Sequence, residues 1–107
     1  MLSIGGWSHG TGGFHYAAKN PMVFARNSLI YIQTHGFDGI DLDWEYPGYV
    51  DHYSKPGKLE DVARYVPFLK AMKSVYGPAG LMVTAAVGAY PVSTNLFVYF
   101  IPRLGTC

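Results

Sequence analysis

Three carboxylates at two-residue steps form the pattern in this chain with the clearest chemical potential. Asp41, Asp43 and Glu45 are separated by single apolar residues. Because successive side chains of a β-strand point to opposite faces, this spacing predicts a strand with all three acids on one face. Like charges crowded on one face repel each other and push the pKa values of neighbouring carboxyls apart. The pattern therefore favours acid–base chemistry.

Two other interpretations of the acids compete with this one. A solvated strand face can carry acids without any function, but it does not need acids alone, crowded so closely. Oxygen-rich clusters also bind Mg²⁺ or Ca²⁺. An EF-hand loop counted from Asp41 needs glycine at its sixth position and glutamate at its twelfth, where this chain has Tyr46 and His52. A two-metal nuclease site would be expected to have basic residues nearby, so we predict neither a metal nor another cofactor.

The segments around the acids predict alternating strands and helices. The expected elements are a strand ending at residue 4, a loop over 8–19, a helix from Pro21 to Gly36, the acid-bearing strand over 37–44, a polar loop over 48–58, a helix over 62–76, a strand over 81–87 and a short helix near the end of 93–103. This order predicts an α/β fold with parallel strands joined by right-handed crossovers. Chemistry in such folds collects at the carboxyl ends of the strands, where Glu45 lies, with Asp43 and Asp41 progressively deeper.

Three local details of these elements are open to test. Pro67 lies inside the second helical pattern and would cost about 3 kcal/mol in a helix interior, so this helix is either kinked there or begins near Val66. The strand over 81–87 is apolar on both faces, which is typical of a buried parallel strand. The four histidines have no metal-ligand spacing and are expected on the surface or in loops: His9, His15, His35 and His52.

Composition limits the classes of partner. Half of the 107 residues are hydrophobic and only 14% are charged, which favours one packed domain over residues 1–107. The net charge of +1 and the lack of a basic cluster predict no binding to nucleic acid or to a membrane surface. The single cysteine, Cys107, excludes an intrachain disulfide. The first residues lack the pattern of a signal peptide, and no apolar run approaches the roughly 20 residues of a membrane span.

The acid pattern also resembles a known family. Residues 37–45 resemble the signature of glycoside hydrolase family 18, the chitinases: an apolar residue followed by D-G-x-D-x-D-x-E. Residues 3–7 resemble the S-x-G-G-W segment of that family, residues 81–87 its L-x-V-T-A-A-V strand, and residues 99–104 more faintly its next helix. The resemblance implies a (β/α)₈ TIM barrel of ~250 residues. This chain would supply about strands three to five, a partial catalytic domain whose barrel is not complete.

The resemblance implies a role for each acid. Family 18 uses the substrate's own 2-acetamido group as the nucleophile in a retaining mechanism. Glu45 would protonate the glycosidic oxygen, and Asp43 would hold the acetamido N–H. Asp41 would share a proton with Asp43, so the two would titrate as a pair. Asp38 and Gly39 would support the start of the strand.

The implied partner is chitin or an N-acetylglucosamine oligosaccharide, a neutral polymer compatible with the small net charge. Trp7 and Tyr46, at expected strand ends, are candidates to stack on sugar rings, although Trp7 could equally belong to the core. The resemblance also implies an extracellular location. A chitin-binding lectin on the same fold would lack the catalytic glutamate, so Glu45 favours an enzyme. An inert fragment is a third possibility, because a sheet of three strands leaves two open edges, and we expect the isolated chain to be weakly active or inactive.

Overall fold

Strands and helices alternate along the part of the chain that the computed structural model describes, residues 1–48 and 57–86. The elements are β1 (Leu2–Gly5), the 3₁₀ turn η1 (Trp7–His9), α1 (Gly12–Lys19), α2 (Pro21–Thr34), β2 (Gly39–Asp43), α3 (Asp61–Tyr76) and β3 (Met82–Ala85). The expected helix near the end of 93–103 lies outside the described residues. Within them, no helix combines the length and the apolar content that a membrane crossing requires.

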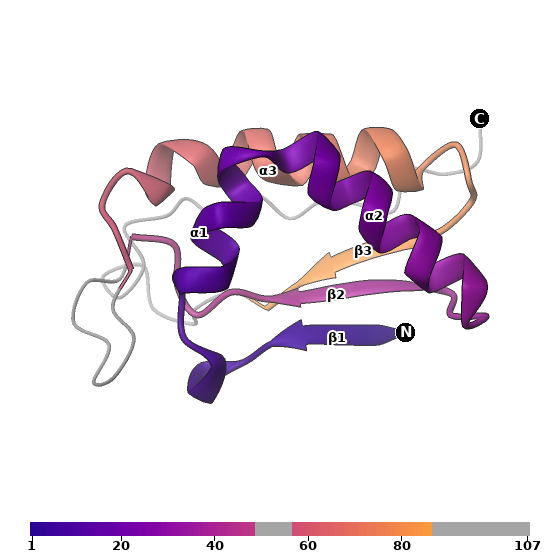
Figure 1. Ribbon diagram of the computed structural model, residues 1–107, viewed down its shortest axis with the longest axis horizontal. Coiled ribbons are helices and arrows are strands. Elements are labelled where there is room, and N and C mark those ends of the chain that lie inside the picture. The colour runs from indigo at the N-terminus through magenta and orange to yellow at the C-terminus, as the bar shows by residue number, and fades with distance from the viewer. Residues whose placement is uncertain (49–56, 87–107) are drawn as a thin grey trace.

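The three strands form one parallel sheet in the order β1-β2-β3. The helices α1, α2 and α3 lie together on one side of this sheet, so the described residues form two layers (Figure 1). The predicted α/β fold with parallel strands is therefore confirmed. Within the described residues the sheet is open and does not close into a barrel.

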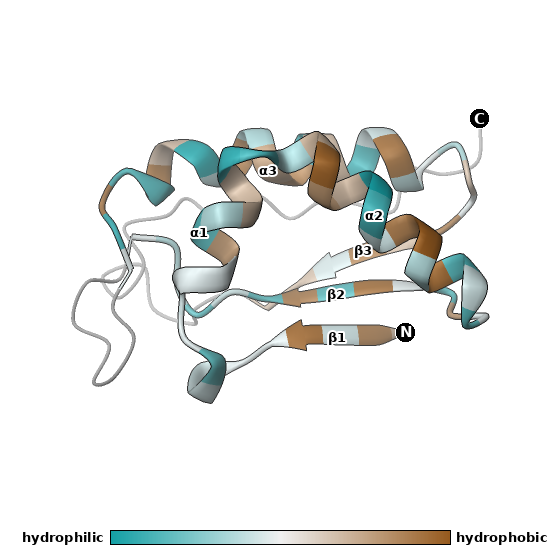
Figure 2. Cartoon of the chain, viewed as in Figure 1, coloured by the Kyte–Doolittle hydropathy of each residue, from teal (hydrophilic) through white to brown (hydrophobic). Residues whose placement is uncertain are grey.

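The core lies between the sheet and the helix layer. Ile40, Leu42 and Trp44 are each no more than 1% exposed, whereas Asp41 and Asp43 between them are only partly buried. Figure 2 shows the resulting alternation of hydrophobic and hydrophilic residues along β2. The helices contribute the remaining large buried side chains, among them Phe14, Ile32, Phe68, Leu69, Met72 and Tyr76.

The helix predicted from Pro21 is confirmed as α2. Its first residue is a proline, which suits a position whose N–H has no helical partner. Asn20 stands at the N-cap but contributes its backbone carbonyl, which accepts from the Phe24 amide at 3.1 Å, and not its side chain. Gly36 has a φ of 70°, as expected for a residue that ends a helix in the left-handed conformation.

The loop expected over 8–19 is wrong, because residues Gly12–Lys19 form α1. Glycines at positions 12 and 13 favoured a loop, but Phe14 and Ala18 lie one helical turn apart and are both buried in the core. The expectation that His15 lies on the surface is also wrong, since its side chain is 3% exposed. Burial of one helical face here outweighs the low helix propensity of glycine.

Two further expectations are corrected. The helix α3 begins at Asp61 and runs through Pro67, so a start near Val66 is wrong. Burial of the apolar side chains of α3 outweighs the cost of the proline. The strand β3 was expected to be buried on both faces, yet Met82 and Thr84 are exposed. The face of β3 that bears these two side chains has no covering layer within residues 1–48 and 57–86.

Candidate active site

A polar row crosses the sheet on the face opposite the helices. The parallel register places Ser3 of β1 beside Asp41 of β2, and Asp41 beside Thr84 of β3. The Thr84 hydroxyl donates to Asp41 Oδ1 at 2.7 Å. The Ser3 hydroxyl lies 3.0 Å from Asp41 Oδ2 and 3.1 Å from Asp43 Oδ2, so it can donate to either carboxylate. Hydroxyls from the two outer strands thus hold the aspartates of the central strand.

The two aspartates have opposite pKa shifts. Burial disfavours the charged form of Asp41, but hydrogen bonds from Thr84 and from the Asp43 carboxyl outweigh burial and lower the pKa of Asp41. Burial raises the pKa of Asp43, and so do its hydrogen bond to Asp41 and the Asp41 charge. The charge of Glu45 raises the pKa of Asp43 as well. The two pKa values are therefore pushed apart, so that Asp43 is protonated before Asp41 as the pH falls.

Thr84→Val should make this separation smaller. The change keeps the side-chain shape and removes the hydroxyl that lowers the pKa of Asp41, so the lower titration step of the pair should move up. The lowered pKa of Asp41 contributes stability above the ordinary value of 3.8, and this contribution is lost as the pH falls through the folded-state value. Stability above pH 3.8 should therefore fall in the variant.

A ¹³C NMR titration of the carboxyl groups measures the pKa of the lower titration step of the pair. Thr34→Val, which removes a hydroxyl bonded only within α2, is the control, and an unmoved lower step in Thr84→Val would contradict the assignment.

Glu45 and Tyr46 follow the carboxyl end of β2. Both are half-buried, and the peptide bond between them is cis. Burial raises the pKa of Tyr46, and the charge of Glu45 and its hydrogen bond to the phenol raise the pKa further. The two side chains therefore interact directly, at the end of the strand where chemistry in such folds collects.

The carboxyl end of β1 lies beside the same edge. The Gly6 amide donates to the Asp43 carbonyl at 2.9 Å, and a Cβ on Gly5 would lie 2.5 Å from that carbonyl oxygen. This close approach explains Gly5, whereas Gly6 has open space around it but a φ of 103°, which favours glycine. Trp7 follows it in η1 with 41% of its surface exposed, so it belongs to the surface at the carboxyl end of β1 and not to the core.

Asp38 and Gly39 lie at the opposite end of β2, away from Glu45. The Asp38 side chain is exposed, while its backbone carbonyl accepts from the Met82 amide at 3.1 Å. Gly39 is buried directly against the Met82 backbone. Both residues thus act on the pairing of β2 with β3 and do not join the polar row.

Sequence reasoning assigned no role to Ser3 and Thr84. A serine or a threonine does not by itself indicate a functional site, since both are common in strands and turns. A signal was present in the period of two, because both lie on the strand face that Asp41 occupies once the three strands are placed in register.

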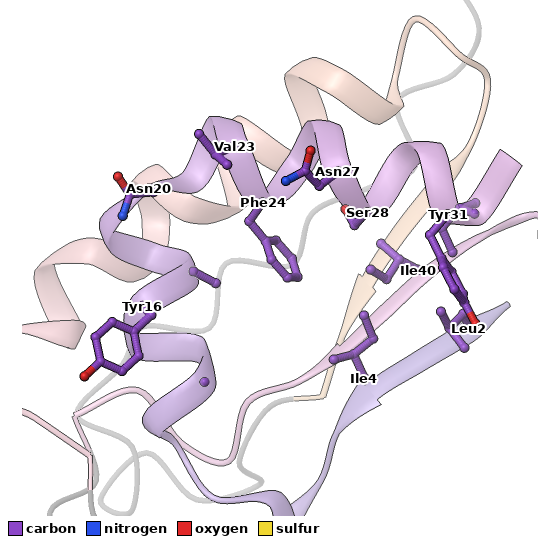
Figure 3. Close-up of a pocket in the computed structure, with 13 residues that line it drawn as sticks. Leu2, Ile4, Tyr16, Asn20, Val23, Phe24, Asn27, Ser28, Tyr31 and Ile40 are labelled. Carbon is purple, nitrogen blue, oxygen red and sulfur yellow. The ribbon is translucent and has the colours of Figure 1, made fainter. Parts of the chain in front are cut away.

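A cavity of about 640 Å³ lies on the other side of the sheet, between β1, α1 and α2. Its lining is mostly apolar, and Figure 3 shows Phe24 reaching from α2 toward the strand residues Ile4 and Ile40. None of the acids lines this cavity. Within residues 1–48 and 57–86, no group of three His, Cys, Asp or Glu side chains is placed to hold a metal ion. The candidate site is therefore the polar row and the strand ends beside it.

Comparison with known proteins shows the family of the chain. Residues 1–104 match the family described as glycosyl hydrolases family 18. The chain belongs to glycosyl hydrolase family 18. It is 39% identical to a probable endochitinase of Caenorhabditis elegans over 97% of this chain, and 37% identical to chitotriosidase-1 of Mus musculus over 81% of this chain.

Solved chitinase structures share the fold of this chain. A Group IV chitinase of Ostrinia furnacalis, solved with allosamidin, superposes on 87% of this chain with a TM-score of 0.76 and 30% identity. A bacterial chitinase, ChiW of Paenibacillus, superposes on 89% with a TM-score of 0.77 and 31% identity. The expected relation to part of a TIM barrel is thus confirmed. The chain spans 17% of the length of the worm relative, 20% of the mouse relative and 25% of the Ostrinia chain.

Proposed function

We propose that the protein containing this chain hydrolyses β-1,4 bonds between N-acetylglucosamine units of chitin, with retention and with the substrate's acetamido group as the nucleophile. The observation that carries the proposal is the bridge from the Ser3 hydroxyl to Asp41 and Asp43, whose pKa values are shifted in opposite directions, two residues before Glu45 on the same chain segment. Membership of family 18 supports the reaction class. The Ostrinia relative was solved with allosamidin, and another chitinase domain of that species with an N-acetylglucosamine oligosaccharide, which supports this class of ligand.

Each acid has a distinct part in the proposed reaction. Glu45, in its protonated form, donates its proton to the glycosidic oxygen as the bond to C1 breaks. The acetamido carbonyl oxygen attacks C1 and forms an oxazolinium ion. Asp43 accepts a hydrogen bond from the acetamido N–H through one carboxyl oxygen. Its other carboxyl oxygen shares a second proton with Asp41. Movement of that proton toward Asp41 leaves Asp43 negative when the ring becomes positive.

The second half of the reaction reverses the role of Glu45. Its carboxylate removes a proton from water, which attacks C1 and opens the oxazolinium ion, so the configuration at C1 is retained. Trp7 and Tyr46, on either side of the strand end, are proposed to stack on the sugar rings. The isolated chain is proposed to be weakly active or inactive, because both edges of its described sheet and the face that carries the acids are open.

The nucleophile can be tested with two substrates. The full-length protein should cleave an N-acetylglucosamine oligosaccharide and release the β-anomer first, as seen by ¹H NMR within the first minutes. It should not cleave the fully deacetylated oligosaccharide, because an amine cannot close the oxazolinium ring. Cleavage of both substrates at similar rates, or release of the α-anomer first, would show that an acetamido nucleophile is not used.

A further inference from the structure

An aromatic box encloses Trp44, the residue that directly precedes Glu45. The Trp44 side chain is 1% exposed. Its ring stacks on Phe14 of α1 at 5.3 Å between centroids with an interplanar angle of 9°. Tyr65 and Phe68 of α3 meet it edge-on, at 5.8 Å and 6.1 Å. Trp44 is therefore held between α1 and α3, directly before Glu45 in the chain.

A buried hydrogen bond joins the same two helices beside this box. His15, next to Phe14 in α1, places Nδ1 2.6 Å from Asp61 Oδ1, and Asp61 is the first residue of α3. The two side chains are 3% and 0% exposed. The other oxygen of Asp61 accepts from the Lys58 amide at 3.3 Å, which also fixes the segment that enters α3. A contact so short and so well enclosed is costly to break, because either partner alone would be left buried and unpaired.

We propose that His15 and Asp61 are positioning residues for Glu45. The pair fixes the spacing of α1 and α3, the two helices hold Trp44, and Trp44 holds the backbone from which the Glu45 carboxyl reaches the substrate. The proposal rests on the proposed function, in which Glu45 is the proton donor. Neither residue touches the substrate, so their effect acts on the placement of the acid, where an error of about 1 Å can cost on the order of 100-fold in rate.

The hydrogen-bond geometry supplies a matched pair of variants. In the tautomer that carries the proton on Nδ1, His15 donates to Asp61, and an asparagine amide nitrogen occupies nearly the same place as Nδ1. His15→Asn therefore keeps the donor, whereas His15→Leu keeps an apolar side chain of similar size without it. His35→Leu makes the same change on an exposed histidine at the end of α2, where the imidazole bonds to the Tyr31 carbonyl, and serves as the control.

The first readout is steady-state hydrolysis of a chitin oligosaccharide by the full-length protein. His15→Leu should lower kcat about 10- to 100-fold with little change in KM. His15→Asn should restore kcat to within about threefold, and His35→Leu should match the unmodified protein. If His15→Leu fails to fold, the double variant His15→Leu/Asp61→Leu removes the unpaired buried charge and should keep the low kcat. Normal kcat in a folded Leu variant, or an equal loss in the Leu and Asn variants, would overturn the proposal.

The second readout does not depend on catalysis. The indole N–H resonance of Trp44 reports the ring stacking in the box. It should shift in His15→Leu, return in His15→Asn and stay in place in His35→Leu. An unmodified protein that cleaves no chitin oligosaccharide would remove the proposed function, and this resonance would still show whether the pair holds the box. A Trp44 resonance that is unmoved in His15→Leu would overturn the positioning role.

Discussion

Glu45→Gln in the full-length protein should lower kcat for a chitin oligosaccharide by about 10²- to 10⁴-fold. Glutamine keeps the shape and the hydrogen-bonding length of the side chain, but it has no acidic proton for the glycosidic oxygen. The partners that surround the site remain, including the phenol of Tyr46 and the Asp41–Asp43 pair. Affinity for the oligosaccharide should therefore stay within about threefold, because the interaction lost is made in the transition state. Product formation and isothermal titration calorimetry measure the two quantities.

The control for this change is the other glutamate of the chain. Glu60 is 51% exposed, pairs with Arg64 at 3.2 Å and also lies 3.7 Å from His15 Nε2. Glu60→Gln should leave kcat within about twofold, since glutamine keeps the length of the side chain and an oxygen that can face His15, and an exposed pair contributes little. Full turnover in Glu45→Gln would remove Glu45 from the role of general acid, whatever the behaviour of the control.

Gly39→Ala should open the pairing of β2 with β3. A Cβ at this position would lie 2.3 Å from the Met82 carbonyl oxygen and 2.9 Å from two further Met82 backbone atoms. Backbone atoms of a paired strand cannot rotate away as a flexible side chain can, so the strands must separate. We expect a loss of about 3 kcal/mol, the upper end of the range for overpacking. That loss corresponds to about 100-fold less protection from hydrogen exchange.

The measurement follows two amides of this ladder by NMR hydrogen exchange. The Met82 amide donates to the Asp38 carbonyl and the Ala86 amide donates to the Leu42 carbonyl, each at 3.1 Å. Gly12→Ala is the matched control, because a Cβ there meets nothing within 4 Å and the residue lies at the start of α1. The control should leave protection unchanged. Equal protection in Gly39→Ala would mean that the strands accommodate the added Cβ without separating, and it would contradict this expectation.

Some elements could be predicted from the sequence and others could not. The period of two in β2 predicted which residues are buried, because a strand packed on one face allows no other register. The start of α2 at Pro21 and its end at Gly36 were predictable because both signals are local backbone chemistry. The relation to family 18 followed from residues 37–45, since the acids and their spacing lie in one continuous segment.

Contacts between distant segments could not be predicted in the same way. The helix α1 forms because Phe14 stacks on Trp44 of a distant segment, although the two glycines at the start of α1 favour a loop. His15 is buried because Asp61, far along the chain, faces it at 2.6 Å. The open face of β3 depends on what covers the sheet and not on the residues of the strand itself.

By itself, the sequence determined the family, the α/β order and the placement of the acids on one strand face, because each of these is encoded by neighbouring residues through backbone geometry. Only the tertiary structure decided which hydrogen bonds the aspartates accept and in which direction their pKa values shift. The register of three strands brings Ser3 and Thr84 onto Asp41, and the pKa values of the aspartates separate as a result. Such contacts join residues about 40 positions apart, and their energies depend on distances that no local pattern contains.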